Sequence, residues 1–248
     1  MPGGAGYIQM LQIIGTVFSG DAGGYDAWLL NDESAALVGA ASPVWAETPA
    51  IEWGPDRYRT RFQARWDAAA LHVRFDAVDD SPWHTMTSRD AHLWDEEVVE
   101  LFLDADGSGR NYAELEINPI NVVCDLRVER PWPSLKSLTS WDWVGLETGV
   151  EPLRTRQGAV QGWTAVARLP WAGLRSLYPA AGGVVLPPPA GSAWRFNVFR
   201  IKRPGGPKKP NDGAIYAAFS KPAGDSFHDP AAFRPLRLVA RPAGKGGV

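Results

Sequence analysis

Residues 93 to 119 contain two runs in which apolar and polar side chains alternate. Apolar residues hold one parity of both runs: Val99, Leu101, Leu103, Leu115 and Ile117. Because successive side chains of a strand point to opposite faces of a sheet, this pattern predicts two half-buried strands. The Asp- and Gly-rich segment 104–109 between them predicts a tight turn, so we expect an antiparallel hairpin.

The other parity of the same hairpin is rich in acids, namely Glu100, Glu114 and Glu116. Closing the hairpin places Glu100 beside Glu116, with about 5 Å between their Cβ atoms. Like charges that face each other across strands are destabilising unless something neutralises them. The candidates are Arg65 or Arg74 on neighbouring strands, a metal ion, or a hydroxyl-rich ligand. A solvated outer face with arginine partners is the purely structural alternative.

Short alternating runs of the same kind follow one another along most of the chain, at 58–66, 71–80, 98–104, 112–118, 121–129, 141–147, 162–169, 193–201 and 214–220. Many short strands with turn residues between them predict an all-β fold, a single antiparallel, jelly-roll-like β-sandwich. Short helical turns are expected only at 26–30 and 170–177. We expect an N-terminal arm at 1–24, the sandwich at 25–240 and a flexible tail at 241–248.

Composition narrows the classes of partner. The net charge is −3, so no basic field recruits nucleic acid or an anionic membrane. The apolar run at 7–18 is too short to span a bilayer and lacks the basic start of a signal peptide. One cysteine, Cys124, excludes an intrachain disulfide and is expected to be a buried apolar residue. Nothing in the sequence argues for an assembly, so a monomer is expected.

The chain has 12 Trp residues, and tryptophan can serve as core or as a surface on which a ligand stacks. The tryptophans fall into two groups according to whether they occupy predicted strands or predicted loops. Trp66, Trp163 and Trp194 occupy strand positions and are expected in the core. The candidates for stacking lie in loop-like segments: Trp94, Trp132, Trp141 and Trp143.

Four stretches, in chain order, resemble the family 9 carbohydrate-binding modules and their relatives in the DOMON-type β-sandwich superfamily. The first joins Arg89-Asp90 and Leu93-Trp94 to Glu100, Phe102, Asp104, Tyr112, Glu114, Asn118 and Pro119. The others are GWTAVARLPWAGL, AWRFNVFRI (with Asn197 and Arg200) and DSFHDPAAFRPLRL. The resemblance covers most of the chain, from about Trp28 to Leu238. It departs from the family at Ala167, near which the family usually has a glutamate.

This resemblance implies non-catalytic binding of a mono- or oligosaccharide, clamped between two Trp rings and held by acids, amides and arginine. It also implies calcium and an extracellular or periplasmic location. A pyranose ring has an apolar face for stacking and hydroxyls that pair with carboxylates, amides and guanidinium groups. The residues carried over as ligand-binding candidates are Trp94, Glu100, Glu114, Glu116, Asn118, Trp141, Asn197 and Arg200.

The segment DADGSG predicts either a turn or a calcium loop. Asp104, Asp106 and Ser108 match the first positions of an EF-hand loop, but the final position would be Leu115 and no helices flank it. A calcium loop of another kind is one interpretation, and its ligands would be Asp104, Asp106 and Ser108. A plain Asp/Gly hairpin turn is the simpler interpretation.

Three other functions are carried as alternatives. Glu100 and Glu116 at about 5 Å would suit a retaining glycosidase, although no other catalytic motif accompanies them. A structural or protein-binding sandwich would show a flat aromatic patch without convergent polar groups. Haem binding would depend on Met86 and the nearby His84, and it is not expected because axial ligands normally come from separate segments.

Overall fold

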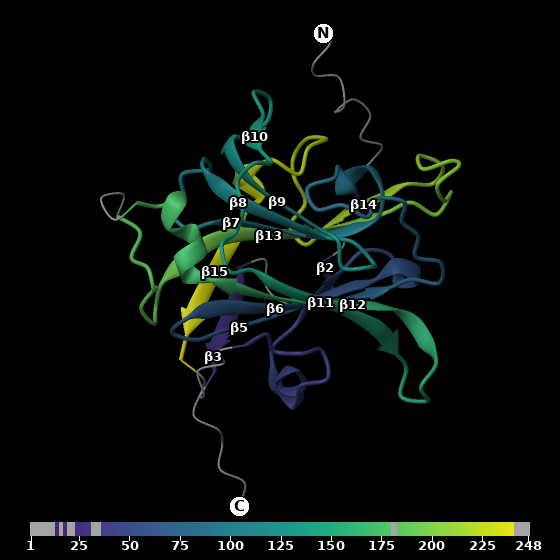
Figure 1. Cartoon of the computed structure of the whole chain (residues 1–248), viewed down its shortest axis with the longest axis horizontal. Coiled ribbons are helices and arrows are strands. Elements are labelled where there is room, and N and C mark those ends of the chain that lie inside the picture. The colour runs from purple at the N-terminus through teal and green to yellow at the C-terminus, as the bar shows by residue number, and fades with distance from the viewer. Residues whose placement is uncertain (1–12, 15–16, 19–22, 31–35, 180–182, 241–248) are drawn as a thin grey trace, which may run out of the picture.

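The computed structural model describes residues 13–14, 17–18, 23–30, 36–179 and 183–240. The predicted tail and most of the predicted arm lie outside the described residues. Two layers of sheet make up the body of the protein, one above the other (Figure 1). The fold is therefore all-β with a few short 3-10 helices, as the sequence predicts.

The upper layer in Figure 1 carries the acidic hairpin. Its strands are β7 (Val98–Asp104), β8 (Tyr112–Ile117), β9 (Val123–Arg130), β10 (Lys136–Leu138), β13 (Ala193–Lys202) and β14 (Ile215–Ala218). The lower layer consists of β4 (Ile51–Trp53), β5 (Thr60–Trp66), β6 (Ala70–Val78), β11 (Glu147–Arg154) and β12 (Val160–Pro170). Strands β15 (Arg234–Val239) and β3 (Tyr25–Leu29) join the layers along one edge, β15 pairing with β13 and β3 with β5.

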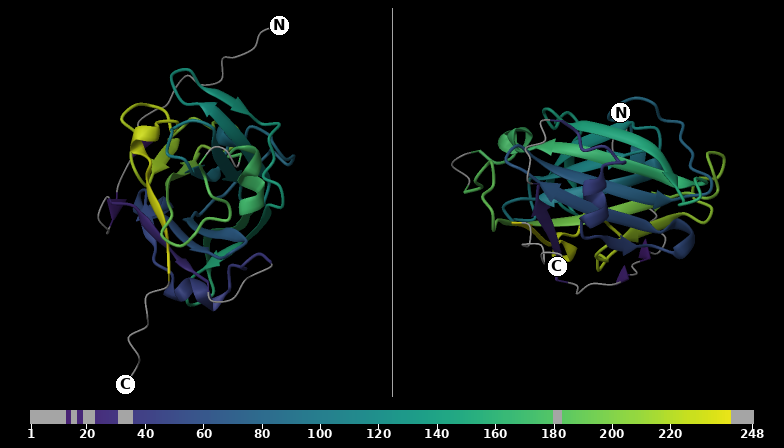
Figure 2. Two further views of the ribbon diagram at one scale, coloured as in Figure 1. Left: turned by 90° about the vertical axis from the view of Figure 1, so that its left-hand side faces the viewer. Right: turned by 90° about the horizontal axis from the view of Figure 1, so that it is seen from below.

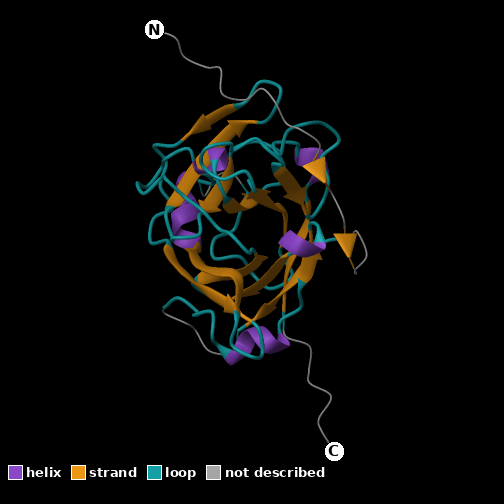
Figure 3. Ribbon diagram, turned by 90° about the vertical axis from the view of Figure 1, so that its right-hand side faces the viewer, coloured by secondary structure: helices purple, strands orange, loops and turns teal. Residues whose placement is uncertain are grey.

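This edge connection makes the described strands one hydrogen-bonded network, an open path that runs from β10 to β11. Viewed end-on, its two layers curve around a common centre (Figures 2 and 3). Most pairings are antiparallel, as expected. Three are parallel: β15 with β3, β3 with β5, and β1 (Ile13–Ile14) with β14. Strand β2 (Val17–Phe18) pairs with β4, so two points of the N-terminal arm lie against the sandwich.

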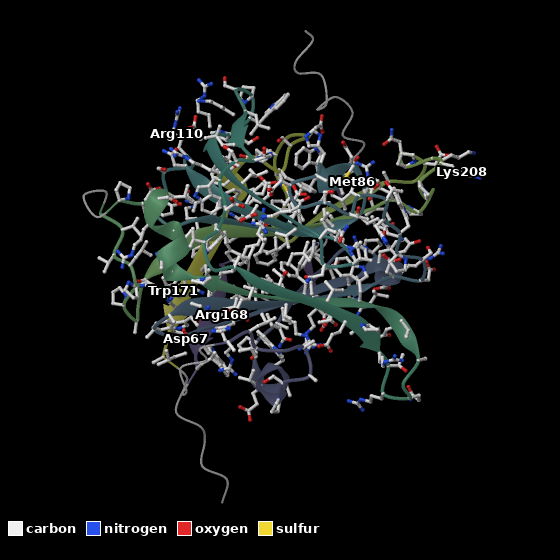
Figure 4. The ribbon with its side chains drawn as sticks, in the orientation of Figure 1. Asp67, Met86, Arg110, Arg168, Trp171 and Lys208 are labelled. Atoms are coloured by element: carbon white, nitrogen blue, oxygen red, sulfur yellow. The ribbon has the colours of Figure 1, made fainter. Side chains whose placement is uncertain are left out.

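The described helices are short 3-10 helices of three to six residues: η1 (Pro43–Glu47), η2 (Asp56–Tyr58), η3 (Leu93–Asp95), η4 (Trp171–Ser176) and η6 (Pro230–Ala232). Helix η4 confirms the helical turn predicted at 170–177. In Figure 4 its Trp171 lies next to Asp67 at the left of the lower layer, and the ring nitrogen donates to the Asp67 carbonyl at 2.9 Å.

Two predicted elements are wrong. Residues 26–30 are not helical, because they form most of β3, which has partners on both sides. Residues 141–147 are not a strand. Trp143 is held there by its backbone N–H, which donates to Asp125 at 2.5 Å, and by its ring N–H, which donates to the Pro170 carbonyl at 3.0 Å.

The main core fills the space between the two layers. Phe62 packs on Phe75 and Phe196, with ring centroids 5.1 and 5.8 Å apart. The predicted core tryptophans Trp66, Trp163 and Trp194 are buried here, and so are the apolar hairpin residues Val99, Leu101, Leu103, Leu115 and Ile117. Trp143, expected as a stacking candidate, is also core, with only 2% of its surface exposed.

A second apolar cluster covers the upper sheet on the side that faces away from the main core. Its buried members are Leu93, Val98, Phe102, Tyr112, Cys124, Leu126, Val128, Phe199, Ile201, Tyr216, Ala218, Phe227 and Phe233. We call this set the outer cluster. Strands β7 and β8 are buried along their whole length on both faces. The half-exposed hairpin predicted from the alternation is therefore wrong on its polar face.

Candidate functional site

The hairpin brings three glutamates together, as the sequence predicts. Glu100 on β7 lies directly opposite Glu116 on β8 in antiparallel register. Glu114 precedes Glu116 by two residues and so shares its face of the sheet. The three carboxylates each place an oxygen within 4.8 Å of the others. We call these residues the glutamate cluster.

The glutamate cluster is buried rather than solvated. Glu100, Glu114 and Glu116 expose 2%, 3% and 0% of their surfaces. Four of their carboxylate oxygens lack a hydrogen-bond donor: Glu100 Oε1, Glu114 Oε2, Glu116 Oε1 and Glu116 Oε2. An unpaired buried carboxylate is costly, so the cluster requires protons, a cation or donor groups from a ligand.

Burial dominates the electrostatics of the cluster. It raises the pKa of Glu114 to about 8, and it raises the pKa of Glu100 and Glu116 well above the usual range. The neighbouring carboxylates add to the shift at Glu100 and Glu116 because like charges repel. Cys124 lies opposite Glu116 on β9, and burial together with the same acids raises the pKa of its thiol. In the absence of a ligand, this environment favours protonated carboxyls.

A loop that leads into β7 forms one wall of the site. Trp94 and Met86 are partly buried against the outer cluster, and Met86 lies on the upper half of the molecule in Figure 4. The Glu96 carboxylate holds the loop by accepting from the backbone N–H groups of Thr85 at 2.8 Å and Met86 at 3.1 Å. The Arg203 guanidinium donates to the Trp94 carbonyl at 2.9 Å and fixes the start of η3.

Trp94 keeps part of its surface accessible at this wall. The exposed His92 imidazole stacks on the Trp94 ring at a centroid distance of 4.5 Å and an interplanar angle of 18°. A flat ring partner is thus already tolerated at Trp94. A sugar ring could occupy the same kind of position if His92 rotated away.

The opposite wall comes from the chain near the C-terminus. Phe227 stacks on Phe199 with centroids 4.2 Å apart, and His228 stacks on Phe102 at 5.0 Å. His228 Nδ1 is 2.9 Å from the Tyr112 hydroxyl and 3.9 Å from Glu114 Oε2. Burial lowers the pKa of His228 to about 3, so the imidazole is neutral at pH 7. His228 therefore pairs with the Tyr112 hydroxyl as a neutral group.

The other predicted ligand residues are not gathered at the glutamate cluster. Asn197 is engaged with Ser220, donating to its carbonyl at 2.7 Å and accepting from its N–H at 3.1 Å. Asn118 accepts the backbone N–H groups of a turn and donates to the Met86 carbonyl at 3.3 Å. Trp141 packs at the main core and donates to the Ser176 hydroxyl at 2.8 Å. These contacts position loops and strands.

Arg200 points into the sandwich, on the opposite face of β13 from the cluster. Its guanidinium lies 2.7 Å from Asp79 and stacks over Trp163 at 5.1 Å. Lys202 joins the same network through Asp79 at 2.8 Å and Glu97 at 2.7 Å. Arg200 therefore cannot neutralise the three glutamates. Neither Arg65 nor Arg74 takes that part, because both lie on β5 and β6 in the lower layer.

The DADGSG segment forms the turn after β7. Asp104 accepts the N–H groups of Gly107 at 3.0 Å and Gly109 at 2.8 Å, and Asp106 accepts that of Ser108 at 2.9 Å. Burial raises the pKa of Asp104 to about 6. The carboxylates thus hold the turn through its own amides, and calcium at Asp104, Asp106 and Ser108 stays a prediction.

The sequence interpretation missed the residues that enclose the cluster. His228 reaches the hairpin from more than 110 positions further along the chain, and no local pattern reveals that contact. Cys124 had a usable signal, because its alternation with Val123 and Asp125 predicts its face once β9 is paired with β8. Among the tryptophans of the described segments, Trp132 is the large exposed one, at 51%.

Comparison with solved structures places this fold among carbohydrate-binding modules. A family 9 module from Caldicellulosiruptor kristjanssonii in complex with cellotriose matches with a TM-score of 0.60 and 14% identity, covering 90% of this chain and 97% of that one. The same family 9 module in complex with glucose gives 0.57 and 14%, covering 90% and 98%. A Bacteroides uniformis protein whose proposed role is carbohydrate binding gives 0.64 and 13%, covering 87% and 99%.

The chain therefore has a family 9-like carbohydrate-binding-module fold, a β-sandwich. At these identities the likeness establishes the fold. No known family profile matches the sequence, and no curated protein matches it. None of the helices in the described ranges has the length and apolar character needed to cross a bilayer.

Proposed function

We propose that this protein is a non-catalytic saccharide-binding module whose site is the glutamate cluster and the neighbouring Trp94. The observation that carries the proposal is the convergence of three buried carboxyl groups with unpaired oxygens, together with a partly exposed indole, Trp94, that packs against the outer cluster. Sugar hydroxyls both donate and accept hydrogen bonds, so they can pair with protonated or ionised carboxyls. The indole offers the apolar surface against which a pyranose ring stacks.

The ligand class follows from the same chemistry and from the neighbours of the fold. The two family 9 module structures contain cellotriose and glucose, so glucose and cello-oligosaccharides are the first ligands to test. Solvent reaches at most 3% of each glutamate, so a sugar enters only if the loop before β7 or the segment at 226–233 shifts. The module acts as a monomer, outside the cytoplasm, on a sugar that reaches it there.

Titration calorimetry with glucose, cellobiose and cellotriose tests the proposal. Trp94→Ala should weaken binding by about 2 kcal/mol or more, as loss of a central aromatic anchor does. Glu100→Gln should also weaken binding, because the amide has one acceptor group fewer. The matched control is Glu151→Gln, which changes an exposed carboxylate on β11 in the lower layer.

Binding that is unchanged in Trp94→Ala and Glu100→Gln would reject this site. The absence of heat with any neutral or acidic sugar at millimolar concentration would favour a protein-binding sandwich. Release of reducing ends from a polysaccharide, lost in Glu100→Gln, would identify a glycosidase instead. The cluster oxygens lie within 4.8 Å of each other, close to the roughly 5 Å carboxyl separation of retaining enzymes.

A further inference from the structure

We infer that Glu100, Glu114 and Glu116 form a binding site for one hard divalent metal cation. The site is separate from the DADGSG turn, where calcium is expected from the sequence. It goes beyond the proposed function because it stands on the cluster alone, whether or not a sugar binds beside it.

The geometry of the three carboxylates fits a single ion. Calcium and magnesium bind oxygen ligands at about 2.0–2.6 Å, so oxygens around one ion lie at most about 5 Å apart. One oxygen from each glutamate meets this limit, with all three within 4.8 Å of one another. The ligands come from two paired strands, β7 and β8, and this rigid support holds them at fixed separation.

The carboxylates also lack another source of positive charge. Within the described segments, no ion pair reaches Glu100 or Glu116. Glu114 has His228 Nδ1 at 3.9 Å, and that nitrogen lies 2.9 Å from the Tyr112 hydroxyl. Glu116 is fully buried, and neither of its oxygens has a hydrogen-bond partner. Both Glu116 oxygens are therefore available as acceptors, and one of them lies among the clustered oxygens that an ion would join.

Another acidic group on the same sheet shows what a compensated cluster looks like. Asp90, Asp125 and Asp142 also place oxygens within 4.8 Å of one another. The Arg89 guanidinium lies among them, in contact with Asp125 and at 3.1 Å from Asp142 and 3.7 Å from Asp90. That group already holds a cation, whereas the glutamate cluster does not.

The donor set selects the class of ion. All three ligands are carboxylates, and neither Cys124 nor His228 places its sulfur or nitrogen among the clustered oxygens. Hard oxygen donors suit calcium, magnesium or manganese, whereas zinc sites usually include nitrogen or sulfur.

The test uses the full chain after removal of metal by a chelator. Manganese binding is followed by electron paramagnetic resonance, and calcium and magnesium are tested as competitors. One manganese should bind per chain. Glu116→Gln should weaken binding at least about 10-fold, since altering even an outer partner of a metal ligand has that effect. Asp106→Asn and Asp142→Asn are the matched controls and should bind as the wild type does.

Folding is measured separately, so that loss of binding can be distinguished from loss of structure. Manganese should raise the melting temperature of the metal-free wild type, because an ion bound only by the folded state stabilises it. If Glu116→Gln does not fold, the inference is tested by the rise in melting temperature with manganese in the wild type and in the two control variants. The inference is overturned if manganese neither binds to the wild type nor raises its melting temperature. It is also overturned if Asp106→Asn or Asp142→Asn loses manganese binding while Glu116→Gln keeps it. Sugar titration in excess chelator reports the proposed function independently.

Discussion

Replacing Lys202 with methionine should unfold the protein more easily, and more so at higher pH. The Lys202 ammonium is fully buried, 2.8 Å from Asp79 and 2.7 Å from Glu97. It also donates to the Ser81 carbonyl at 2.9 Å. Removing one partner of a buried ion pair leaves the other charge uncompensated and costs about 3–5 kcal/mol. Asp79 keeps Arg200 at 2.7 Å, so most of the loss arises at Glu97.

The dependence on pH follows from the Glu97 carboxyl. Burial raises its pKa from 4.5 to about 7 in the folded protein. Because the folded-state pKa lies above the unfolded value, the contribution of Glu97 to stability is complete below pH 4.5 and is lost as the pH rises to about 7. That loss is about 3 kcal/mol, at 1.36 kcal/mol per pKa unit. Without the ammonium of Lys202 the pKa of Glu97 rises further, and the loss continues above pH 7.

Urea unfolding followed by tryptophan fluorescence at about pH 5 and about pH 8 measures both effects. Lys202→Met should lose several kcal/mol at the higher pH and clearly less at the lower pH, where Glu97 is protonated. The control is Lys209→Met, whose side chain is 72% exposed and lies 3.6 Å from Asp212. An exposed pair of this kind contributes at most about 1 kcal/mol. Equal losses in the two variants, or a loss in Lys202→Met that does not change with pH, would refute the reasoning.

Three further predictions concern other parts of the fold. Gly162→Ala should strongly destabilise the protein or prevent folding, because a Cβ there would lie 2.0 Å from the Ala77 carbonyl oxygen. A soluble variant with the wild-type melting temperature would contradict this. Tyr112→Phe should lower the free energy of unfolding, measured in urea, by about 1–2 kcal/mol, because it removes the 2.9 Å hydrogen bond to His228. An unchanged free energy of unfolding would show that this bond contributes nothing to stability. If calcium occupies the DADGSG turn, chelation should lower the melting temperature, and Asp106→Ala should remove the part of that drop that the turn contributes. An equal drop in Asp106→Ala and in wild type shown to start calcium-loaded means a plain turn.

The hairpin shows how much of the site the sequence could predict. Period-2 alternation correctly placed Val99 and Leu115 in the core and paired Glu100 with Glu116, because strand geometry and the turn fix the register. The same alternation could not predict that the acidic face is buried. That burial depends on His228 and Phe233, whose rings contact Phe102 on β7 across more than 120 positions of the chain.

Helix and loop errors have the same origin. Residues 26–30 became a strand because two neighbouring strands offer them hydrogen bonds, which local propensity cannot foresee. Arg200 alternates onto the core face of β13, and the motif that suggested a ligand role does not reveal its ion pair with Asp79. Trp94 lies outside the strands, just before the acidic strand, as the sequence predicts, and its indole is partly exposed. Its role in stacking a ligand stays a prediction.

A crystal structure of the protein soaked with cellotriose tests the central claim most directly. The account predicts a sugar ring stacked on Trp94, with a hydroxyl within hydrogen-bonding distance of a carboxyl oxygen of Glu100 or Glu116. The loop before β7 or the segment at 226–233 should shift to admit it. A sugar bound elsewhere, for example in the pocket lined by Asp106, Ser192 and Trp194, with the glutamate cluster still sealed, would contradict the account.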